Sequence, residues 1–557
     1  MKSTTILLLL LVFATFCKAQ NTRYIITLTN KQGSRYSVSN SFSYLSSESI
    51  QRKKKFNVAI DSTDFPVTPA YLDSIKLAGN VEIINTSKWL NQVLIKTTDL
   101  DALNKISKFP FVKNQFAIAK KLNGGTKDQG IQGEITNSAT LVTNSNMANA
   151  LNYGNSGSQI YIHEGEFLHN KGLQGTGIKV AVLDAGFARY QNITAFDSLR
   201  IGNKILGTWD FVEKNNSVNE DDIHGMWCLS ILAANIPGSY IGSAPQASYY
   251  LFRTEDVASE FPVEEQNWAA AAERADSLGV DIITSSLGYS EFDDPAFNYT
   301  YADMNGKKTM VSRAASLAVQ KGMIVTNSAG NEGGRKWKFI IAPADVEEVL
   351  SVGAVNINKQ VASFSSYGPT ADGRVKPDVG SVGWNTFLIN LNGTVGQGNG
   401  TSFSNPNLAG LIACLWQAFP DFNNKEIINA VKQSADRFSS PDTRTGYGIP
   451  NMRLAFSLLE KERKTREAKL ILKTSLIKAF PNPISNKCTI LYKGISNGKL
   501  SLKLYGIDGK NIRLYNFDTI ENEYHYFTLD QLDLLPLGQY MLQYYDGVNT
   551  GIIRLSK

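Results

Sequence analysis

Three segments of the chain carry residue types that together could activate a serine for attack on a carbonyl carbon. Ser402 stands in GNGTSFSNP, His224 opens HGMWCLSILAAN, and Asp184 ends the apolar run IKVAVLD. A serine hydroxyl is a poor nucleophile unless a neighbouring base removes its proton. Histidine can be that base, and a carboxylate can hold its ring in the productive tautomer. The three residue types therefore suggest acyl transfer, provided that the fold brings them together.

The surroundings of Ser402 suit a nucleophile at the start of a helix. Gly400 lets the backbone turn tightly before the apolar run LAGLIACLWQAF. The first backbone N–H groups of a helix have no intrahelical partners and favour negative charge, so they could hold a developing oxyanion. Serine and threonine are also common helix caps, and the segment taken alone fits that simpler role.

The other candidate residues also have structural explanations when each is taken alone. Asp184 follows a buried strand pattern at the end where open α/β sheets place their sites, but a turn aspartate fits equally well. His224 begins a helical pattern, a position at which histidine is more often structural. Asn331, after the apolar run GMIVTNSAG, could direct its amide N–H at a carbonyl oxygen or could belong to an ordinary turn.

Taken in order along the chain, these segments resemble the subtilisin-like serine proteases, the subtilases. The order Asp184, His224, Ser402 is that of subtilisin. GVDIITSSLG, MIVTNSAGNEGG, SVGAVN, ASFSSYGPTADGRVKPD, GTSFSNP and GYGIPN follow the histidine segment in family order. Two positions depart from the family pattern, because Met226 stands where threonine is common and VGSVG follows Lys-Pro-Asp. Neither change removes a catalytic atom, so the departures bear on the specificity.

The resemblance implies a role for each candidate residue. Ser402 would be the nucleophile, His224 the general base and then the general acid, and Asp184 the group that orients the imidazole. Asn331 and the Ser402 backbone N–H would form the oxyanion hole. Five residues would bind the substrate at two strand ends and wall the primary specificity pocket: Ser286, Leu287, Gly288, Ala329 and Gly330.

The pattern between residues 126 and 460 predicts an α/β domain. Strand-like apolar runs such as IKVAVLDAG and VDIITSSLG alternate with helical runs such as WAAAAERADSLG and MVSRAASLAVQKG. Such alternation is typical of a parallel sheet with helices on both faces. We therefore expect a subtilisin-like, doubly wound parallel sheet in this catalytic domain.

The first residues, MKSTTILLLLLVFATFCKAQ, have the pattern of a secretory signal peptide comprising residues 1–19. No later stretch reaches the roughly 18 apolar residues of a membrane-spanning helix. We expect a protein that is secreted or displayed at the cell surface by way of the periplasm, without a stable membrane span.

Residues 20–125 predict a small α+β domain, with strand runs such as RYIITL and QVLIKTT. Its place before a subtilase domain resembles that of a propeptide, the alternative being a permanent accessory domain. The polar, glycine-rich KKLNGGTKDQGIQGE that follows suits a linker with a cleavage site. The basic run RKKK at 52–55 suits a solvated face or a processing site.

The C-terminal part predicts a charged linker, residues 461–475, and a β-sandwich, residues 476–557. Short strand runs such as CTILYKG and QYMLQYYDG alternate there with turn signals. The Pro-Asn-Pro opening, the Gly-Lys turn and the final Gly-x-Tyr are similar to the type A sorting domain of the Bacteroidetes type IX secretion system. A sugar-binding or protein-binding module is the alternative.

Composition adds few further constraints. A net charge of +6 gives no reason to expect nucleic acid as a partner. Cys228, Cys414 and Cys488 remain after the signal peptide and predict buried free thiols rather than a disulfide framework. The expected catalysis requires no cofactor and no metal. Structural calcium is not indicated, because DDP at 293–295 and NED at 219–221 also fit solvated loops.

These observations lead to one functional hypothesis and two rivals. The hypothesis is a secreted serine endopeptidase that is made as a zymogen, exported by type IX secretion and acts on protein or peptide substrates. One rival is a catalytically silent surface adhesin that keeps the subtilase fold. The other is an esterase, which the absence of a Gly-x-Ser-x-Gly elbow around Ser402 disfavours.

Overall fold

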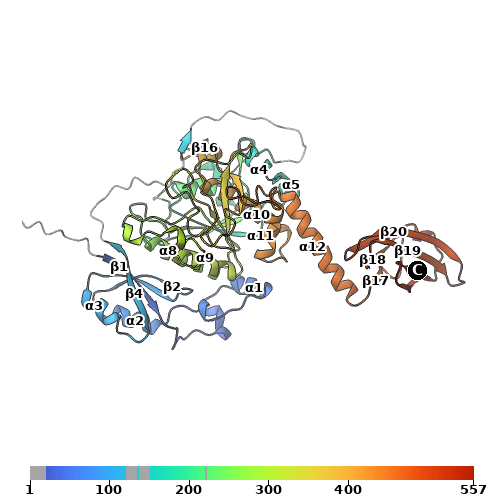
Figure 1. Cartoon of the computed structure of the whole chain (residues 1–557), viewed down its shortest axis with the longest axis horizontal. Helices are drawn as coiled ribbons and strands as arrows, with labels where there is room; N and C mark the ends of the chain where they lie inside the picture. Colours follow the sequence, from blue (N-terminus) through green and yellow to red (C-terminus); the bar gives the residue numbers. More distant parts are fainter. Residues whose placement is uncertain (1–20, 121–133, 137–150, 220–221) are drawn as a thin grey trace, which may run out of the picture. The chain divides into compact units, whose positions relative to one another are not determined.

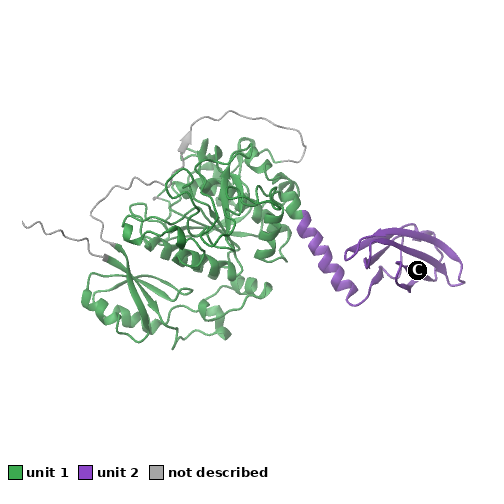
Figure 2. Cartoon of the chain, viewed as in Figure 1, with its two compact units in different colours: residues 1–456 green, residues 457–557 purple. Residues whose placement is uncertain are grey.

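The computed structural model describes residues 21–120, 134–136, 151–219 and 222–557. The predicted signal peptide and most of the glycine-rich linker lie outside the described residues. The chain divides into two compact units, Met1–Phe456 and Ser457–Lys557 (Figure 2). Within the described ranges no helix is long and apolar enough to cross a membrane.

A four-stranded antiparallel sheet forms the core of the N-terminal domain, the expected propeptide (Figure 1). Its strand order is β2 (Glu82–Ser87), β3 (Gln92–Lys96), β1 (Asn21–Leu28), β4 (Val112–Lys120). Helices α2 (Pro69–Lys76) and α3 (Leu100–Ile106) pack on the sheet, where Ile75 and Ile106 meet Val93 and Ile95. The α+β prediction for this region is confirmed.

Helix α1 (Ser47–Lys55) lies in the long connection between β1 and α2 and carries the RKKK run. Lys54 and Lys55 are exposed, but Arg52 and Lys53 are only 5% and 0% exposed. The prediction that this run forms a solvated face or a processing site is therefore wrong for Arg52 and Lys53. Their burial depends on residues more than 200 positions away along the chain, which a local charge pattern does not reveal.

The subtilase-like part of the first unit is built on a seven-stranded sheet whose neighbouring strands are all parallel. The order is β14 (Val379–Val382), β13 (Leu350–Val355), β12 (Ile324–Ser328), β11 (Ile282–Ser285), β6 (Lys179–Asp184), β10 (Ser248–Arg253), β7 (Ile205–Asp210). Strands of a parallel sheet buried on both faces are nearly continuous apolar runs, as VAVL in β6 is. The predicted doubly wound parallel sheet is confirmed.

Helices cover both faces of this sheet. Alternate residues of β6, Ala181 and Leu183, join one core with α8 (Val263–Ser277) and α9 (Met310–Gln320). On the other face, α10 (Thr401–Ala418) packs against α7 (His224–Ala233) and the strands from β11 to β14. The strand order changes direction around β6, because β10 and β11 lie on its two sides. In open α/β sheets, sites form at the carboxyl ends of strands at such a point.

A smaller sheet precedes α10. Its order is β15 (Thr386–Ile389), β16 (Val395–Asn399), β5 (Glu134–Thr136), and both pairings are antiparallel. Strand β16 ends three residues before Ser402, so the chain enters α10 directly from this sheet.

Glu265 in α8 gives the first unit a pH-dependent stability. It accepts hydrogen bonds from the Tyr299 hydroxyl at 2.6 Å and the Val311 N–H at 2.9 Å. Burial raises the pKa of Glu265 to about 7, although these hydrogen bonds act in the opposite direction. The folded state therefore binds more protons than the unfolded state between about pH 4.5 and 7, and the free energy of unfolding falls as the pH rises through that window.

We expect Glu265→Gln to remove this slope, which corresponds to about 3 kcal/mol across the window. Chemical unfolding at several pH values, in a Ser402→Ala background that prevents self-digestion, measures it. Glu347→Gln, at an exposed glutamate, is the control. Equal slopes in the two variants would contradict the assignment.

The second unit contains two antiparallel sheets. One has the order β17 (Ile477–Phe480), β18 (Cys488–Lys493), β21 (Tyr524–Leu529), and the other β20 (Asn511–Thr519), β19 (Gly498–Gly506), β22 (Gln539–Tyr545), β23 (Thr550–Ser556). Ile490 and Leu529 of the first sheet share a core with Leu502 and Leu542 of the second. The predicted sandwich is thus present. The predicted linker falls largely within helix α12 (Met452–Leu472), which spans the boundary of the units.

Candidate active site

Asp184 and His224 lie together at the carboxyl edge of the parallel sheet. Asp184 ends β6, and His224 is the first residue of α7. The Nδ1 atom of His224 lies 2.7 Å from Oδ1 of Asp184, a hydrogen-bond distance. Both side chains are buried, and Oδ1 of Asp184 also accepts the Ala185 N–H at 2.8 Å. The carboxylate therefore fixes which imidazole nitrogen faces it.

The electrostatics of His224 follow from this pair. Burial disfavours the imidazolium and lowers the pKa of His224, but the charge of Asp184 and its hydrogen bond outweigh burial, so the pKa lies well above its ordinary value. An imidazole with a raised pKa is a stronger base. The histidine is thus prepared to take a proton at its other nitrogen, Nε2.

Ser402 is the second residue of α10. Its Oγ hydrogen-bonds to the Ser286 carbonyl at 3.5 Å, while Nε2 of His224 is buried without a hydrogen-bond partner among the described residues. The structure thus leaves the bond between Ser402 and His224 unmade. Such bonds are often long without substrate and tighten in the reacting complex.

Cys228 contacts both His224 and the backbone of Ser402. Its Sγ is 3.9 Å from Nδ1 of His224 and 3.4 Å from the Ser402 carbonyl oxygen. Cys228, Cys414 and Cys488 are all free and buried, which confirms the prediction of unpaired thiols. The contacts of Cys228 show how closely α7 and the start of α10 approach each other.

Asn331 is held beside the start of α10. Its Oδ1 accepts hydrogen bonds from the Thr401 backbone N–H at 2.9 Å and the Thr401 hydroxyl at 3.0 Å. With the carbonyl end of the amide fixed in this way, its NH₂ group has a defined direction. Within the described part of the chain no hydrogen bond occupies that group.

The five predicted substrate-binding residues follow two adjacent strands. Ser286, Leu287 and Gly288 come after β11, and Ala329 and Gly330 come after β12. Both segments are tied to α10, because the Ser286 hydroxyl donates to the Ser402 carbonyl at 2.9 Å and the Gly330 N–H to Thr401 Oγ1 at 3.2 Å. The two segments are therefore positioned relative to Ser402.

Ile341 occupies the space between these segments and was not predicted from the sequence. A Cβ atom added to Gly288 would come within 2.4 Å of its side chain, and one added to Gly330 within 3.0 Å. The backbone around Ile341 joins both segments, because its N–H donates to Ala329 at 3.4 Å and Ala342 pairs with Tyr289. The contact of Ile341 with Gly288 links positions more than 50 residues apart, so no local motif signals it.

The other histidines lie elsewhere. His163 is held by the Pro450 carbonyl and the Ser381 hydroxyl, both at 2.9 Å, and burial lowers its pKa to about 4. His169 is likewise buried, bonded to the Tyr153 hydroxyl and the Ser243 carbonyl. His525 belongs to the second unit. Among the described histidines only His224 contacts a carboxylate in this way.

Two groups of side chains within the described ranges have the spacing of metal ligands: Asp184 with His224 and Cys228, and Glu255 with Glu260 and Glu264. The first is the site already described. In the second, the Glu264 carboxylate accepts hydrogen bonds from the backbone N–H groups of Asp256 and Phe261, in the loop that precedes α8. No sequence motif indicated this second group. Part of NED at 219–221 lies outside the described residues.

Two parts of the chain match known protein families. Residues 175–448 match the Subtilase family, Peptidase S8, and residues 23–134 match the Peptidase S8 propeptide domain of Bacteroidota. The chain thus carries a subtilase domain, a serine peptidase domain, preceded by a propeptide domain of the same peptidase class.

Individual relatives align with the subtilase domain. Subtilisin Savinase of Lederbergia lenta is 28% identical over 288 residues, which cover 52% of this chain and 93% of that protein. Subtilisin E of Bacillus subtilis strain 168 is 29% identical over 272 residues, or 48% of this chain and 63% of that protein. The thermostable alkaline protease of Halalkalibacterium halodurans is 25% identical over 357 residues, or 63% of this chain and 84% of that protein.

Proposed function

We propose that this protein is a secreted serine endopeptidase, made as a zymogen, that hydrolyses peptide bonds through an acyl-enzyme on Ser402. The observation that carries the proposal is the buried 2.7 Å contact of His224 Nδ1 with Asp184, with Nε2 left unpaired close to the start of α10. The matches to the subtilase and propeptide domains support the same reaction class.

The proposed reaction uses only groups of the chain. His224 Nε2 takes the proton of Ser402 Oγ as the oxygen attacks the scissile carbonyl carbon, and the imidazolium is stabilised by Asp184. The C–N bond then breaks as His224 returns the proton to the leaving amine. Water hydrolyses the acyl-enzyme by the same proton transfers in reverse order. The mechanism requires no cofactor and no metal.

The oxyanion of the tetrahedral intermediate would be held by the Asn331 amide and the Ser402 backbone N–H. The anchoring of Asn331 Oδ1 by Thr401 supports this role, because it orients the donor before the charge develops. Ser402 lies in the first turn of α10, where N–H groups lack intrahelical acceptors.

The substrate would bind as an extended strand along Ser286, Leu287 and Gly288, since backbone pairing recognises many sequences. The residue before the scissile bond would enter the space between this segment and Ala329 with Gly330. Ile341 fills part of that space, so we expect the enzyme to prefer small side chains there.

Accordingly, Ile341→Gly should raise kcat/KM for a phenylalanine at that position relative to alanine by about 10- to 100-fold, the scale on which pocket size discriminates substrates. Peptide p-nitroanilides that differ only in this residue measure the ratio. Ile357→Gly, at an isoleucine that is 52% exposed, is the control. An unchanged ratio in Ile341→Gly would place the specificity pocket elsewhere.

Two flanking segments support export. Residues 1–19 have the signal-peptide pattern, and we propose that residues 476–557 are a type A sorting domain that addresses the protein to the type IX machinery. The sandwich formed by this region is compatible with that role. Deleting residues 476–557 should leave the protein in the periplasm of a host with type IX secretion.

Labelling with a serine-directed phosphonate tests the catalytic proposal. We expect the processed protein to be labelled on Ser402 and to degrade an unstructured protein substrate. Ser404→Ala, at a serine in the same helix turn whose hydroxyl bonds the Thr401 carbonyl, is the control and keeps the labelling. Equal behaviour of the parent protein and Ser402→Ala, with neither labelled nor active, would favour the adhesin instead.

A further inference from the structure

A pocket of about 490 Å³ lies in the first unit, and none of the candidate active-site residues lines it. Its wall comes from four parts of the chain: 151–161, 356–358, 384–387 and Gln397 of β16. Hydrogen bonds hold these distant parts together. The Phe387 N–H donates to Gln159 Oε1 at 3.0 Å, and Gln397 Nε2 donates to the Asn385 carbonyl at 3.4 Å. The pocket is therefore a defined part of the fold, with a volume that suits a small ligand.

Four aromatic residues line the pocket: Tyr153, Tyr161, Trp384 and Phe387. The Tyr153 hydroxyl lies 2.7 Å from Nδ1 of His169, a hydrogen bond that holds this buried ring in place. Tyr161 packs edge-on against it, with the ring centroids 5.6 Å apart, and is itself 46% exposed. Trp384 is half-buried. Aromatic faces carry a partial negative charge and attract C–H groups. The pocket therefore suits a ligand with a flat apolar face.

Side-chain amides supply most of the polar groups of the pocket: Asn152, Asn155, Asn356, Asn358, Asn385 and Gln397. A carboxamide both donates and accepts hydrogen bonds. Within the described residues no hydrogen bond engages the side chains of Asn358 and Asn385, and the buried Oδ1 of Asn155 has no partner. These amides therefore keep hydrogen-bonding capacity for a ligand.

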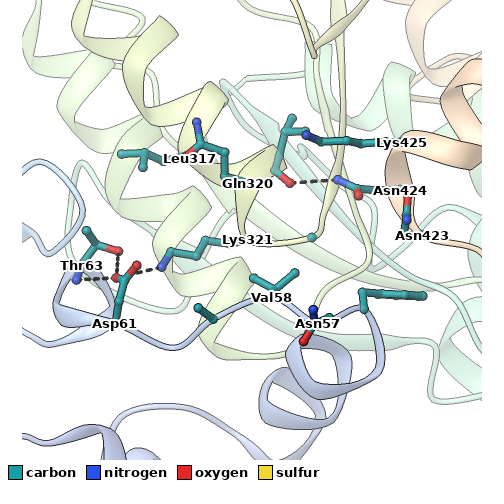
Figure 3. A pocket seen from close by; sticks show the side chains of 14 residues that line it. Asn57, Val58, Asp61, Thr63, Leu317, Gln320, Lys321, Asn423, Asn424 and Lys425 are labelled. Carbon is teal, nitrogen blue, oxygen red and sulfur yellow. Dashed lines mark hydrogen bonds and ion pairs between the residues drawn. The ribbon is translucent and has the colours of Figure 1, made fainter.

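The pocket also lacks charge, because none of its 15 described lining residues is ionisable as an acid or a base at neutral pH. Lys359, which follows Asn358, is exposed and pairs with Asp436 at 2.9 Å. A second pocket, between the N-terminal domain and the rest of the first unit, differs in this respect: Figure 3 shows Lys321 extending there toward Asp61. Burying an unpaired charge is costly, so the uncharged pocket selects an uncharged ligand.

A ligand that fits this pocket has an apolar face for the rings and several groups that both donate and accept hydrogen bonds. A neutral sugar has both properties, because its C–H groups form an apolar ring face and its hydroxyls surround that face. An extended peptide instead presents its donors and acceptors along its backbone and pairs with a main-chain edge. We propose that this pocket binds an uncharged sugar, a hexose unit of a neutral oligosaccharide. The inference is independent of the proposed peptidase activity.

The pocket lies within reach of the candidate active site. Gln397 stands five residues before Ser402, and five extended residues span at most about 18 Å. A sugar bound in the pocket can therefore belong to a glycan on a protein whose backbone occupies the proposed cleft, or to a separate polysaccharide. Both sources present the same chemistry to the pocket.

Calorimetric titration of the full chain carrying Ser402→Ala tests the binding, because this background prevents self-digestion. The probes are the neutral trisaccharides maltotriose, cellotriose and mannotriose, with trigalacturonic acid and the glucosamine trimer as charged counterparts. We expect at least one neutral trisaccharide to bind, and both charged trimers to bind at least about 10-fold more weakly. Trp384→Ala should raise the Kd at least about 10-fold, since aromatic anchors carry much of the free energy of binding. Trp337→Ala is the control, at a half-buried tryptophan outside the pocket.

Tyr161→Ala is a second variant that keeps the proposal testable if Trp384→Ala does not fold, which thermal unfolding reveals. Its control is Tyr526→Ala, because Tyr526 is similarly exposed, at 40%, and belongs to the second unit. We expect Tyr161→Ala to weaken the binding of the neutral trisaccharide and Tyr526→Ala to leave it unchanged.

Two pull-down experiments distinguish the sources of the sugar. Capture by an immobilised ribonuclease with a neutral oligomannose glycan, but not by the same ribonuclease after enzymatic removal of the glycan, indicates a sugar on a protein. Retention by insoluble cellulose or amylose indicates a polysaccharide. In either case Trp384→Ala should abolish the retention.

Three results would overturn the proposal. One is that no neutral trisaccharide binds, whether or not the uncharged peptide Ala-Asn-Ala does. Another is that the charged trimers bind as tightly as the neutral ones. The third is that Trp384→Ala and Tyr161→Ala bind sugar with the affinity of their controls. All variants carry Ser402→Ala, so failure of the peptidase proposal would appear in the phosphonate experiment and not in this one.

Discussion

Replacing His224 with alanine will lower kcat for peptide hydrolysis on the order of 10⁶-fold, the effect of losing the triad serine or histidine in subtilisin. The reason is that, among the described residues, Ser402 Oγ hydrogen-bonds only to the Ser286 carbonyl, which is too weak a base to take the proton of a nucleophile at neutral pH. Steady-state hydrolysis of a peptide p-nitroanilide measures the loss.

The variant has to be cut by an added protease between propeptide and catalytic domain and then separated from the propeptide, because without its proposed base it is not expected to process itself. His525→Ala is the control, since His525 is the histidine of the second unit. It should leave kcat unchanged. A residual activity of His224→Ala within 100-fold of the parent protein would show that another residue acts as the base.

Asp184→Asn should lower kcat by about 10⁴-fold, the effect of the corresponding change in a serine protease triad. The amide cannot stabilise the imidazolium and no longer selects the productive tautomer. In the parent protein Asp184 outweighs burial and raises the pKa of His224. In the variant burial remains while that charge is gone, so the pKa of His224 should fall. Because the proposed base His224 acts in its neutral form, the acid limb of kcat/KM should move to lower pH.

A pH profile of kcat/KM, measured with stopped assays on the same propeptide-free material, separates these two effects. Asp222→Asn is a useful control, because Asp222 accepts the backbone N–H of His224 at 2.7 Å without contacting its ring. That variant should keep the position of the acid limb. An acid limb that stays in place in Asp184→Asn would mean that the carboxylate does not set the basicity of His224.

Local sequence patterns were sufficient to place the main candidates. Four apolar residues before Asp184 predict a buried strand that ends at the carboxyl edge of a sheet, and the structure has β6 there. The apolar run after Ser402 predicts a helix, and α10 begins at Thr401. Each pattern lies within a few consecutive residues, so the periodicity of apolar residues predicted the strand and the helix directly. No local pattern predicted that Asp184 pairs with His224. Only the order of Asp184, His224 and Ser402 along the chain suggested it.

The contacts that were missed connect distant segments. Ile341 reaches Gly288 and Gly330 because Ala342 pairs with Tyr289, and nothing in its own neighbourhood distinguishes it from other apolar residues. Arg52 and Lys53 read as a solvated basic run, because the carboxylate that pairs with them stands at position 276. Charge patterns describe a local helix face and do not predict which charges become buried against another domain.

The buried thiol of Cys228 affects how well this site resists oxidation. Only the thiolate reacts readily with oxidants, and burial and the nearby Asp184 carboxylate raise the pKa of Cys228 above its usual value. Cys228 is 1% exposed and its sulfur contacts the Ser402 carbonyl, so an added oxygen atom would find little free space in the packed interior. A cysteine at the centre of the site is therefore compatible with a long working life in an oxidising medium.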